Sequence, residues 1–312
     1  MPTPRCLRRA HCTRRARPSR RARRTAATAA ATAAAFAALL GGALPALASE
    51  GVVEINQARA LAGGVTPTDA PGFPVTLGQP GSYRLTSDLA LPPGTATGVD
   101  VIEVTVDEVS IDLAGFTLRG VASCTGLGAA VTCAGAGAGR GIDAGIANQI
   151  SVRGGTVTGM SGIGVVIGSY AHVEDLRVEG NALNGLDLNE ACVVRGASAI
   201  RNGGNGFDLG GGCSVSNVTA YGNKQVGVAS SDGTVIEGSS SVANGSHGYS
   251  VQGGSLVSGC VARSNGGFGV NSTTSGYQGS ALTFNSGGNA NPQASGGFSL
   301  GANVCGTDTV CP

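Results

Sequence analysis

The sequence contains no Trp and a single Lys, Lys224, and aromatic residues make up only 4% of its 312 positions. A chain so poor in aromatic side chains is not expected to build a bulky aromatic core. It is rich instead in Gly, with 54 copies, and 41% of its residues are hydrophobic. This hydrophobic content excludes a disordered chain of the usual kind. Small residues mixed with β-branched ones favour tightly stacked strands.

Acidic residues are missing from the first 48 positions, whereas ten Arg gather in residues 1–24. An uncharged Ala- and Leu-rich stretch follows over 25–47, and "ALPALA" ends at Ala48. A basic region, an apolar region and an A-x-A-type site together predict a secretory signal over residues 1–48. Two alternatives stay open: a twin-arginine signal at "SRRARR" (19–24), and an apolar segment that is kept as a membrane anchor. The true start codon stays open as well.

Removing the signal changes the charge. All nineteen acidic residues follow position 48, against nine Arg and one Lys, so the net charge there is −9. No basic surface of the kind that binds nucleic acid is expected. We expect an exported protein (periplasmic, secreted or at the cell surface) with no membrane span after cleavage.

Seven Cys follow the signal, and an exported chain can pair them. Cys124 with Cys133 and Cys305 with Cys311 are close pairs in Gly-rich, loop-like sequence, and we predict both disulfides. Their spacing is not that of a zinc site. For Cys192, Cys213 and Cys260 the pairing stays open, because Cys192 and Cys213 fit either a disulfide or two buried thiols.

The strongest pattern is a repeat of 21 residues. Residues of one type recur at the same position of successive repeats, and we call each such set a column. Gly and Val columns keep the same period as an Asn column over five or six repeats, as in Gly164, Gly185 and Gly206. The Asn column consists of Asn181, Asn202, Asn223, Asn244 and Asn265. Random Gly-rich sequence would not keep several residue types in register over this distance.

Within one repeat, apolar residues alternate with polar ones. Phe207 and Leu209 share a face while Asp208 takes the other, and Gly, Asn and Ser interrupt each short run. This period indicates short strands joined by turns. Strands of constant repeat length with one apolar face stack as coils of a parallel β-solenoid, about 4.8 Å apart. The Asn column is predicted to be a structural ladder in one turn. An Asn-lined ligand groove is the alternative.

The Asn-x-x-x-Gly pattern followed by an alternating strand, in "NALNGLDL" and "NGSHGYSV", resembles the right-handed parallel β-helix repeat proteins of the pectate-lyase-like superfamily. "VSIDLAGFTLRG" and "GANVCGTDTVCP" resemble flanks of its uncharacterised exported bacterial members. The resemblance implies an all-β chain: one right-handed parallel β-helix with 21-residue coils and short end caps. We expect an N-terminal cap and first strands over 49–99, with a short helix within 52–62, repeats over 100–285 and a C-terminal cap over 286–312. We expect a monomer.

Outward positions are where chemistry would lie, because inward ones fill the core. Asp187 and Asp208 hold the same outward position on successive coils. Two carboxylates this close repel each other unless they are solvated, protonated or bridged by a cation. The resemblance implies that such stacked acids can hold Ca²⁺, which in turn holds an acidic sugar. Two solvated Asp on an exposed sheet are the alternative.

A lyase also needs a base and a cation beside the acids. Arg201 and Lys224 in neighbouring turns are candidates, and His172 is a third. The hydrolase signature of the superfamily is missing, since His247-Gly248 has no Arg-x-Lys after it. A separate outward column of Arg153, Glu174 and Arg195 predicts a ladder of exposed ion pairs.

Two function classes remain. We expect a non-catalytic carbohydrate-binding or structural protein of the cell envelope, with polysaccharide as its partner. The alternative is a Ca²⁺-dependent polysaccharide lyase or epimerase of pectate-lyase type. The fold is a scaffold for both, and the substrate stays open.

Overall fold

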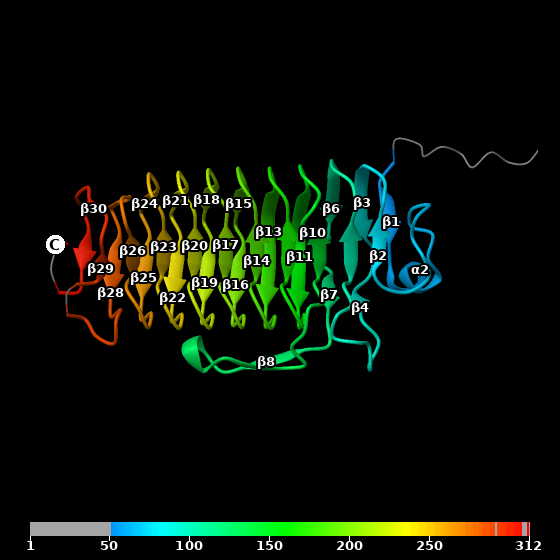
Figure 1. Cartoon of the computed structure of the whole chain (residues 1–312), viewed down its shortest axis with the longest axis horizontal. Coiled ribbons are helices and arrows are strands. Elements are labelled where there is room, and N and C mark those ends of the chain that lie inside the picture. The colour runs from blue at the N-terminus through cyan, green and yellow to red at the C-terminus, as the bar shows by residue number, and fades with distance from the viewer. Residues whose placement is uncertain (1–50, 291, 308–310, 312) are drawn as a thin grey trace, which may run out of the picture. The chain divides into compact units, whose positions relative to one another are not determined.

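The computed structural model describes residues 51–290, 292–307 and 311, and the predicted signal lies outside them. Residues from Val53 onward wind into one right-handed parallel β-helix, as the repeat predicts (Figure 1). Apart from one hairpin, its strands belong to two long parallel sheets, which we call sheet A and sheet B. Among the described residues, no helix has the length and apolar character needed to cross a bilayer.

Sheet B takes one strand from each coil and has ten strands. Most contain three residues, of which the first and third point inward and the middle one outward. They are β2 (Val75–Leu77), β5 (Ile102–Val104), β10 (Ile142–Ala144), β12 (Val165–Ile167), β14 (Leu186–Leu188), β17 (Phe207–Leu209), β20 (Val228–Ser230), β23 (Tyr249–Val251), β26 (Val270–Ser272) and β29 (Ala294–Ser295).

Sheet A has nineteen strands and takes two from most coils. In two coils the pair is continuous, giving the eight-residue strands β11 (Ser151–Thr158) and β13 (His172–Glu179). The others are β1 (Val53–Ile55), β3 (Gly81–Leu85), β4 (Leu89–Ala90), β6 (Val109–Asp112), β7 (Thr117–Arg119), β15 (Val193–Arg195), β16 (Ser198–Ile200), β18 (Ser214–Ser216), β19 (Thr219–Tyr221), β21 (Val235–Glu237), β22 (Ser240–Val242), β24 (Leu256–Ser258), β25 (Val261–Arg263), β27 (Gly276–Gln278), β28 (Ala281–Thr283), β30 (Phe298–Ser299) and β31 (Val304–Cys305).

The register explains the 21-residue period. Leu186 pairs with Phe207, and Phe207 pairs with Val228, so each inward residue stacks on its equivalent in the next coil. All three side chains are fully buried. Burying Leu, Val and Phe side chains in this way contributes roughly 1.5–3 kcal/mol each. The narrow core needs no Trp, because every coil supplies its own apolar layer.

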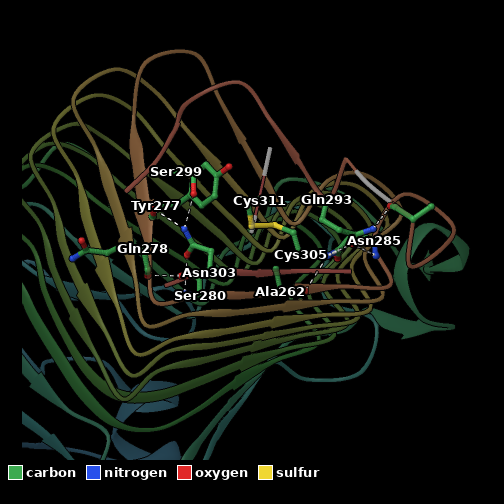
Figure 2. Close-up of a disulfide and its surroundings, with 11 residues drawn as sticks. Ala262, Tyr277, Gln278, Ser280, Asn285, Gln293, Ser299, Asn303, Cys305 and Cys311 are labelled. Carbon is green, nitrogen blue, oxygen red and sulfur yellow. Dashed lines mark hydrogen bonds between the residues drawn. A yellow bond between two sulfur atoms is a disulfide. The ribbon is translucent and has the colours of Figure 1, made fainter. Parts of the chain in front are cut away.

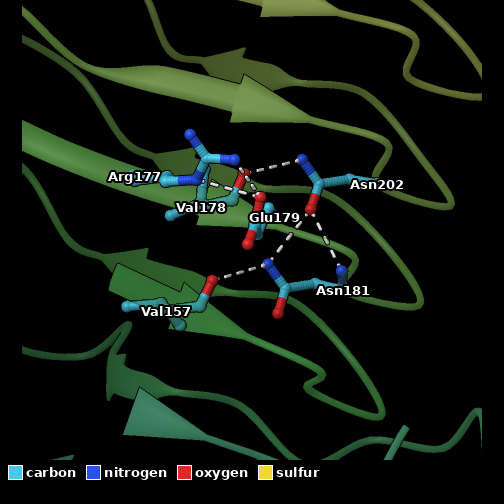
Figure 3. A network of polar contacts seen from close by, with 6 residues as sticks. All are labelled: Val157, Arg177, Val178, Glu179, Asn181 and Asn202. Atoms are coloured by element: carbon cyan, nitrogen blue, oxygen red, sulfur yellow. Dashed lines mark hydrogen bonds and ion pairs between the residues drawn. The ribbon is translucent and has the colours of Figure 1, made fainter. Parts of the chain in front are cut away.

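The Asn column forms a continuous ladder inside the turn that leads from sheet A to sheet B. Asn181 Oδ1 accepts from Met160 N. From Asn202 onward, each Asn Oδ1 accepts two hydrogen bonds from the preceding Asn, one from its backbone N–H and one from its Nδ2. Asn181 donates both to Asn202, over 3.1 and 3.0 Å, and also donates to the carbonyl of Val157 (Figure 3). The five Asn side chains are at most 1% exposed. They therefore pair the buried backbone of the turn, as a structural ladder does.

In the C-terminal half of the solenoid, the other two turns of a coil carry ladders of the same design, built from smaller polar residues. Cys213 N donates to Thr234 Oγ1 over 3.4 Å, and Thr234 N donates to Ser255 Oγ over 3.1 Å. In the third turn, Val218 N donates to Ser239 Oγ over 3.2 Å. Small polar residues in these columns thus pair backbone groups that no strand reaches.

A helix covers the N-terminal end, but it is shorter than residues 52–62. Val53–Ile55 form strand β1 because they pair with Tyr83–Leu85, and α2 (Gln57–Ala62) follows. Gln57 pairs the free edge of β4: its Nε2 donates to Ala90 O over 3.0 Å and its Oε1 accepts from Ala90 N over 2.8 Å. The helix therefore covers an edge that would otherwise be open.

At the C-terminal end, the Asn ladder runs on through Asn285 to Gln293, whose Oε1 accepts from Asn285 N over 2.8 Å. Asn303 pairs the last coils by accepting from Ser280 N over 2.9 Å and donating to Tyr277 O over 3.0 Å (Figure 2). Cys305 and Cys311 form a disulfide beside them. These contacts pair groups of the last coils that no further coil covers.

Two more disulfides are present. Cys192 and Cys213 are joined inside the solenoid, which resolves the choice that the sequence left open, and Cys260 is buried and free. Cys124–Cys133 closes a hairpin between coils, made of β8 (Ser123–Thr125), a 3-10 turn η1 (Gly128–Ala130) and β9 (Thr132–Ala134). We call residues 121–139 the disulfide hairpin. It lies along the solenoid, across several coils (Figure 1).

The predicted ion-pair ladder of Arg153, Glu174 and Arg195 needs correction. The three residues do stack as neighbours. In the described chain, however, Arg153 pairs with Asp112 of the preceding coil, with 2.9 Å between Nη2 and Oδ2, and no ion pair joins it to Glu174. Asp112 lies 41 residues before Arg153, because that coil carries the disulfide hairpin, so a 21-residue period does not find it.

Candidate functional site

The outward face of sheet B carries one side chain from each strand, and most of these side chains are polar and half-buried. The row runs from the N-terminal to the C-terminal coil as Thr76, Glu103, Asp143, Val166, Asp187, Asp208, Ala229, Ser250, Asn271 and Ser295. We call it the sheet B row. It is a flat surface along the solenoid on which hydrogen-bonding groups recur about every 4.8 Å.

Asp187 and Asp208 are direct partners in this row. The strand alternation puts both outward, between inward Leu and Phe residues. Partial burial raises the pKa of Asp187, and the neighbouring Asp208 raises it further, whereas Asn184 and the more distant charge of Arg140 act in the opposite direction. Asp187 therefore takes up a proton more readily than an ordinary Asp side chain.

A second column lies three residues before the sheet B row, in the turn that enters each strand. It contains Asp100, Arg140, Ile163, Asn184, Asn205, Val226, His247 and Phe268. Its Asp, Asn and His side chains accept the backbone N–H of the equivalent residue one coil later. Asn184 Oδ1 accepts from Asn205 N over 2.9 Å, Asn205 Oδ1 from Val226 N over 3.0 Å, and His247 Nδ1 from Phe268 N over 2.9 Å.

The amides of this entering column also reach the acids. Asn184 Nδ2 and Asn205 Nδ2 both donate to Asp208 Oδ2, each over 3.1 Å. Their amide oxygens are already occupied by backbone N–H groups. The two Asn therefore act as donors that hold the Asp208 side chain in place, and their oxygens are not free as metal ligands.

Arg140 is the cation of this face, and the sequence analysis did not find it. Its Nη1 lies 2.6 Å from Asp143 Oδ2, and its charge lowers the pKa of Asp187. The signal was present in "GRGIDA", where Arg140 precedes Asp143 by three residues, as Asn184 precedes Asp187. Val166 lies 23 residues after Asp143, so a strict 21-residue period does not place Arg140 in the column of Asn184.

A depression of about 470 Å³ opens beside this ion pair. Glu103, Arg140 and Asp143 line it, with Ile146 at its rim. The Ile146 side chain is 83% exposed. Charged groups next to an apolar side chain provide both hydrogen bonds and an apolar contact to a polar, ring-shaped ligand.

The three candidate catalytic residues lie on other surfaces. His172 begins β13 and is exposed on sheet A, between Ser151 and Val193. Arg201 lies in the turn after β16 and lines a cavity with Arg119 and Cys124. Lys224 lies in the equivalent turn one coil later, where its backbone N–H donates to Asn202 O. The structure thus brings Asp187 and Asp208 together without any of the three.

The described residues contain no group of three or more His, Cys, Asp and Glu side chains placed to hold a metal ion. Asp187 and Asp208 supply two carboxylates, whereas Ca²⁺ takes six to eight oxygen ligands. The protein groups therefore do not form a closed Ca²⁺ cage here.

Comparison with solved structures agrees with the fold. The chain is similar to the A-module of the mannuronan C-5 epimerase AlgE4 from Azotobacter vinelandii, with a TM-score of 0.54 and 16% identity over 77% of this chain and 69% of that module. It also aligns with the periplasmic alginate epimerase AlgG (TM-score 0.39, 12% identity, 74% and 69% covered) and the Dettilon tailspike protein (TM-score 0.39, 13% identity, 73% and 60% covered). The likeness to the A-module supports the right-handed parallel β-helix fold.

No family model matches the sequence, and no curated protein matches it. Identity at this level shows the shared fold alone, and that fold carries many activities.

Proposed function

We propose that this chain is an exported, monomeric carbohydrate-binding protein, and that the sheet B row is its binding face. The observation that carries the proposal is the row of mostly polar outward side chains, in which Asp187 and Asp208 stack directly between Val166 and Ala229. A glycan chain is a line of hydroxyl groups, and carboxylate and hydroxyl side chains on successive coils can accept and donate along it. A flat row without a deep cavity suits binding along a chain.

Three features favour binding over catalysis. The Asp208 carboxylate is fixed by two amide donors. Arg201, Lys224 and His172 lie on surfaces away from the pair. The one described cation near the acids, Arg140, pairs closely with Asp143. An acid, a base and a free cation therefore do not converge on one reacting atom, which acid–base catalysis requires.

Export is part of the proposal. The predicted signal over residues 1–48 suggests it, and three disulfides in the described chain support it, since disulfides persist in oxidising compartments. A cell-envelope location would bring the sheet B row into contact with polysaccharide.

The test is binding of neutral and acidic oligosaccharides to residues 49–312, measured by calorimetry. The wild type is compared with Asp187→Asn/Asp208→Asn and with Asp232→Asn, an exposed Asp outside the row, as control. Loss of binding in the double variant alone supports the proposed face. Binding that the double variant keeps, or binding of no oligosaccharide by the wild type, contradicts it.

The second candidate is a Ca²⁺-dependent polysaccharide lyase or epimerase. The direct stacking of Asp187 on Asp208 favours it, because two neighbouring carboxylates repel each other unless a cation bridges them or they are solvated or protonated. It requires that Ca²⁺ bind Asp187 and Asp208 and take its other ligands from water and the sugar. Calorimetric Ca²⁺ binding that the double variant loses, together with unsaturated or epimerised products from an acidic polysaccharide, would establish it. Absence of such products with Ca²⁺ present would exclude it.

A further inference from the structure

A cavity of about 290 Å³ lies between the disulfide hairpin and the coil edges, outside the sheet B row. The outgoing arm of the hairpin forms one wall with Ser123 and Cys124, and the ends of β7 and β11 contribute Arg119 and Thr158. Arg201 contributes the far side, from the turn after β16. Residues from four successive coils and from the hairpin therefore surround one volume, which has the size of a small ligand site.

This cavity is lined by positively charged side chains, whereas the chain after position 48 has a negative net charge. Neither Arg119 nor Arg201 forms an ion pair with a described residue. The one acid in the wall, Glu179, is already neutralised by Arg177, whose Nε lies 2.9 Å from Glu179 Oε2 (Figure 3). Two guanidinium groups thus remain without a carboxylate, in a chain whose net charge after position 48 is −9.

Glycines keep the cavity open around Arg201. Its equivalents in the coils before and after are Gly180 and Gly222. A methyl group at Gly180 would meet only Thr158 Oγ1, at 4.0 Å, so the space on that side is free. At Gly222 a methyl group would lie 2.6 Å from Leu127 Cδ2 and 3.6 Å from Arg201 Cγ. Because Gly222 has no side chain, Leu127 at the tip of the hairpin can lie close to the aliphatic part of Arg201.

We propose that Arg119 and Arg201 form a second carbohydrate site, which binds the carboxylate of a uronic acid residue in an acidic polysaccharide. A guanidinium group matches a carboxylate with two parallel hydrogen bonds. Two such groups on a wall that also carries the Thr158 and Ser123 hydroxyls can hold both the carboxylate and the ring hydroxyls of the sugar. The site rests on the proposed carbohydrate function and names its substrate class, but it lies apart from Asp187 and Asp208 and needs no cation.

The experiment is calorimetry of residues 49–312 with tetragalacturonate in the presence of EDTA, with cellotetraose as the neutral comparison and sodium sulfate as the simple anion. Arg119→Gln/Arg201→Gln is compared with Arg195→Gln/Arg263→Gln, which removes the same charge from exposed positions elsewhere. Because two charge-assisted contacts are lost, the first variant is expected to bind tetragalacturonate about tenfold more weakly or worse. The second variant is expected to bind it like the wild type. Circular dichroism and thermal melting verify that both variants fold.

Four outcomes overturn the site: equal weakening in both double variants, unchanged binding in Arg119→Gln/Arg201→Gln, no tetragalacturonate binding by the wild type, or sulfate binding as tightly as tetragalacturonate. Asp187→Asn/Asp208→Asn separates this site from the proposed function. Binding lost with the Arg variant and kept with the Asp variant supports the cavity and counts against the sheet B row as the acidic-sugar face. The reverse pattern overturns the cavity alone.

Discussion

Asn181 and Asn202 lie 21 residues apart and are joined twice, because Asn202 Oδ1 accepts both the backbone N–H and the side-chain Nδ2 of Asn181. Asn202 repeats the pair of bonds with Asn223 over 3.0 Å each. A side chain with one oxygen and one NH₂ group can accept twice from the coil before while it donates to the coil after. The period of the sequence is therefore a period of buried hydrogen bonds as much as one of apolar packing.

Substitution of Asn223 by Ala is expected to cost about 3–4 kcal/mol of unfolding free energy, since it leaves several buried groups unpaired at once. These are two donors of Asn202 and the carbonyl of Ala199. Asn244 Oδ1 loses the side-chain donor and keeps only the backbone N–H of residue 223. Urea unfolding followed by circular dichroism measures the effect. Asn271→Ala, on the outward face of sheet B, is the control and should change stability by less than about 0.5 kcal/mol. Similar losses in both variants would refute the ladder as a stabilising element.

The period alone was enough to predict the strands, the inward stacking of Phe207 and the ladder through Asn265, because each coil obeys the same geometry. It could not find Asn285 and Gln293, since the spacing changes to 20 and then to 8 residues while the hydrogen bonds continue. It also could not place the disulfide hairpin, which pairs with turns far along the chain, as Gly128 N does with Gly222 O.

The candidate site was predictable only where it follows the period. Asp187 and Asp208 stack as their spacing indicates. Arg140 and Asp143 belong to the same face, but the hairpin separates their coil from the preceding one, so sequence spacing does not relate them to Glu103. Arg201 follows the period, yet its turn opens toward the hairpin and away from the acids. Which of two nearby turns a side chain faces depends on tertiary contacts that no spacing records.

Asp187→Asn is expected to raise stability near neutral pH and to lose that advantage in acid. The folded protein holds the pKa of Asp187 above its ordinary value of 3.8, because burial and Asp208 disfavour the charged form. The favourable contribution of the protonated carboxyl to the free energy of unfolding is complete below pH 3.8. It is lost as pH rises through the raised pKa. Melting temperatures from pH 3 to 8 test this, with Asp232→Asn as control. A variant less stable than wild type at pH 7 would contradict it.

His247 predicts a second pH dependence, of opposite sign. Burial lowers its pKa from 6.5, and its neutral Nδ1 accepts the Phe268 N–H over 2.9 Å. Stability from this group is present above pH 6.5 and is lost as pH falls toward the lowered pKa, because the protonated ring cannot accept.

Asn at position 247 should remove this dependence, because Asn184 and Asn205 make the same contact in the same column. His247→Asn is expected to melt with a flatter profile between pH 5 and 7.5 (a range of about one unit either side of an ordinary His pKa). It should lose roughly 0.5–1.5 kcal/mol at the upper end, since the ring stacks on Phe268 with 5.8 Å between centroids. His172→Asn, on exposed sheet A, is the control. An unchanged profile in His247→Asn would assign the pH dependence to other groups.

The disulfide hairpin is held at both ends, and its two attachments should be separable. Cys124–Cys133 closes the arms, and Gly128 N donates to Gly222 O over 2.9 Å at the tip. Cys124→Ser/Cys133→Ser is expected to destabilise the folded hairpin by roughly 2–3 kcal/mol, because the disulfide no longer closes its loop. The solenoid should stay folded, since its coils pair independently of the hairpin. Limited proteolysis should then cut within residues 121–139 much faster, while the thermal transition of the coils stays in place. Cys305→Ser/Cys311→Ser, at the C-terminal end, should leave the hairpin protected.

Because Ser123 and Cys124 form a wall of the cavity that Arg119 and Arg201 line, Cys124→Ser/Cys133→Ser should also weaken tetragalacturonate binding. Faster cleavage with unchanged binding would mean that the hairpin covers the cavity without shaping it.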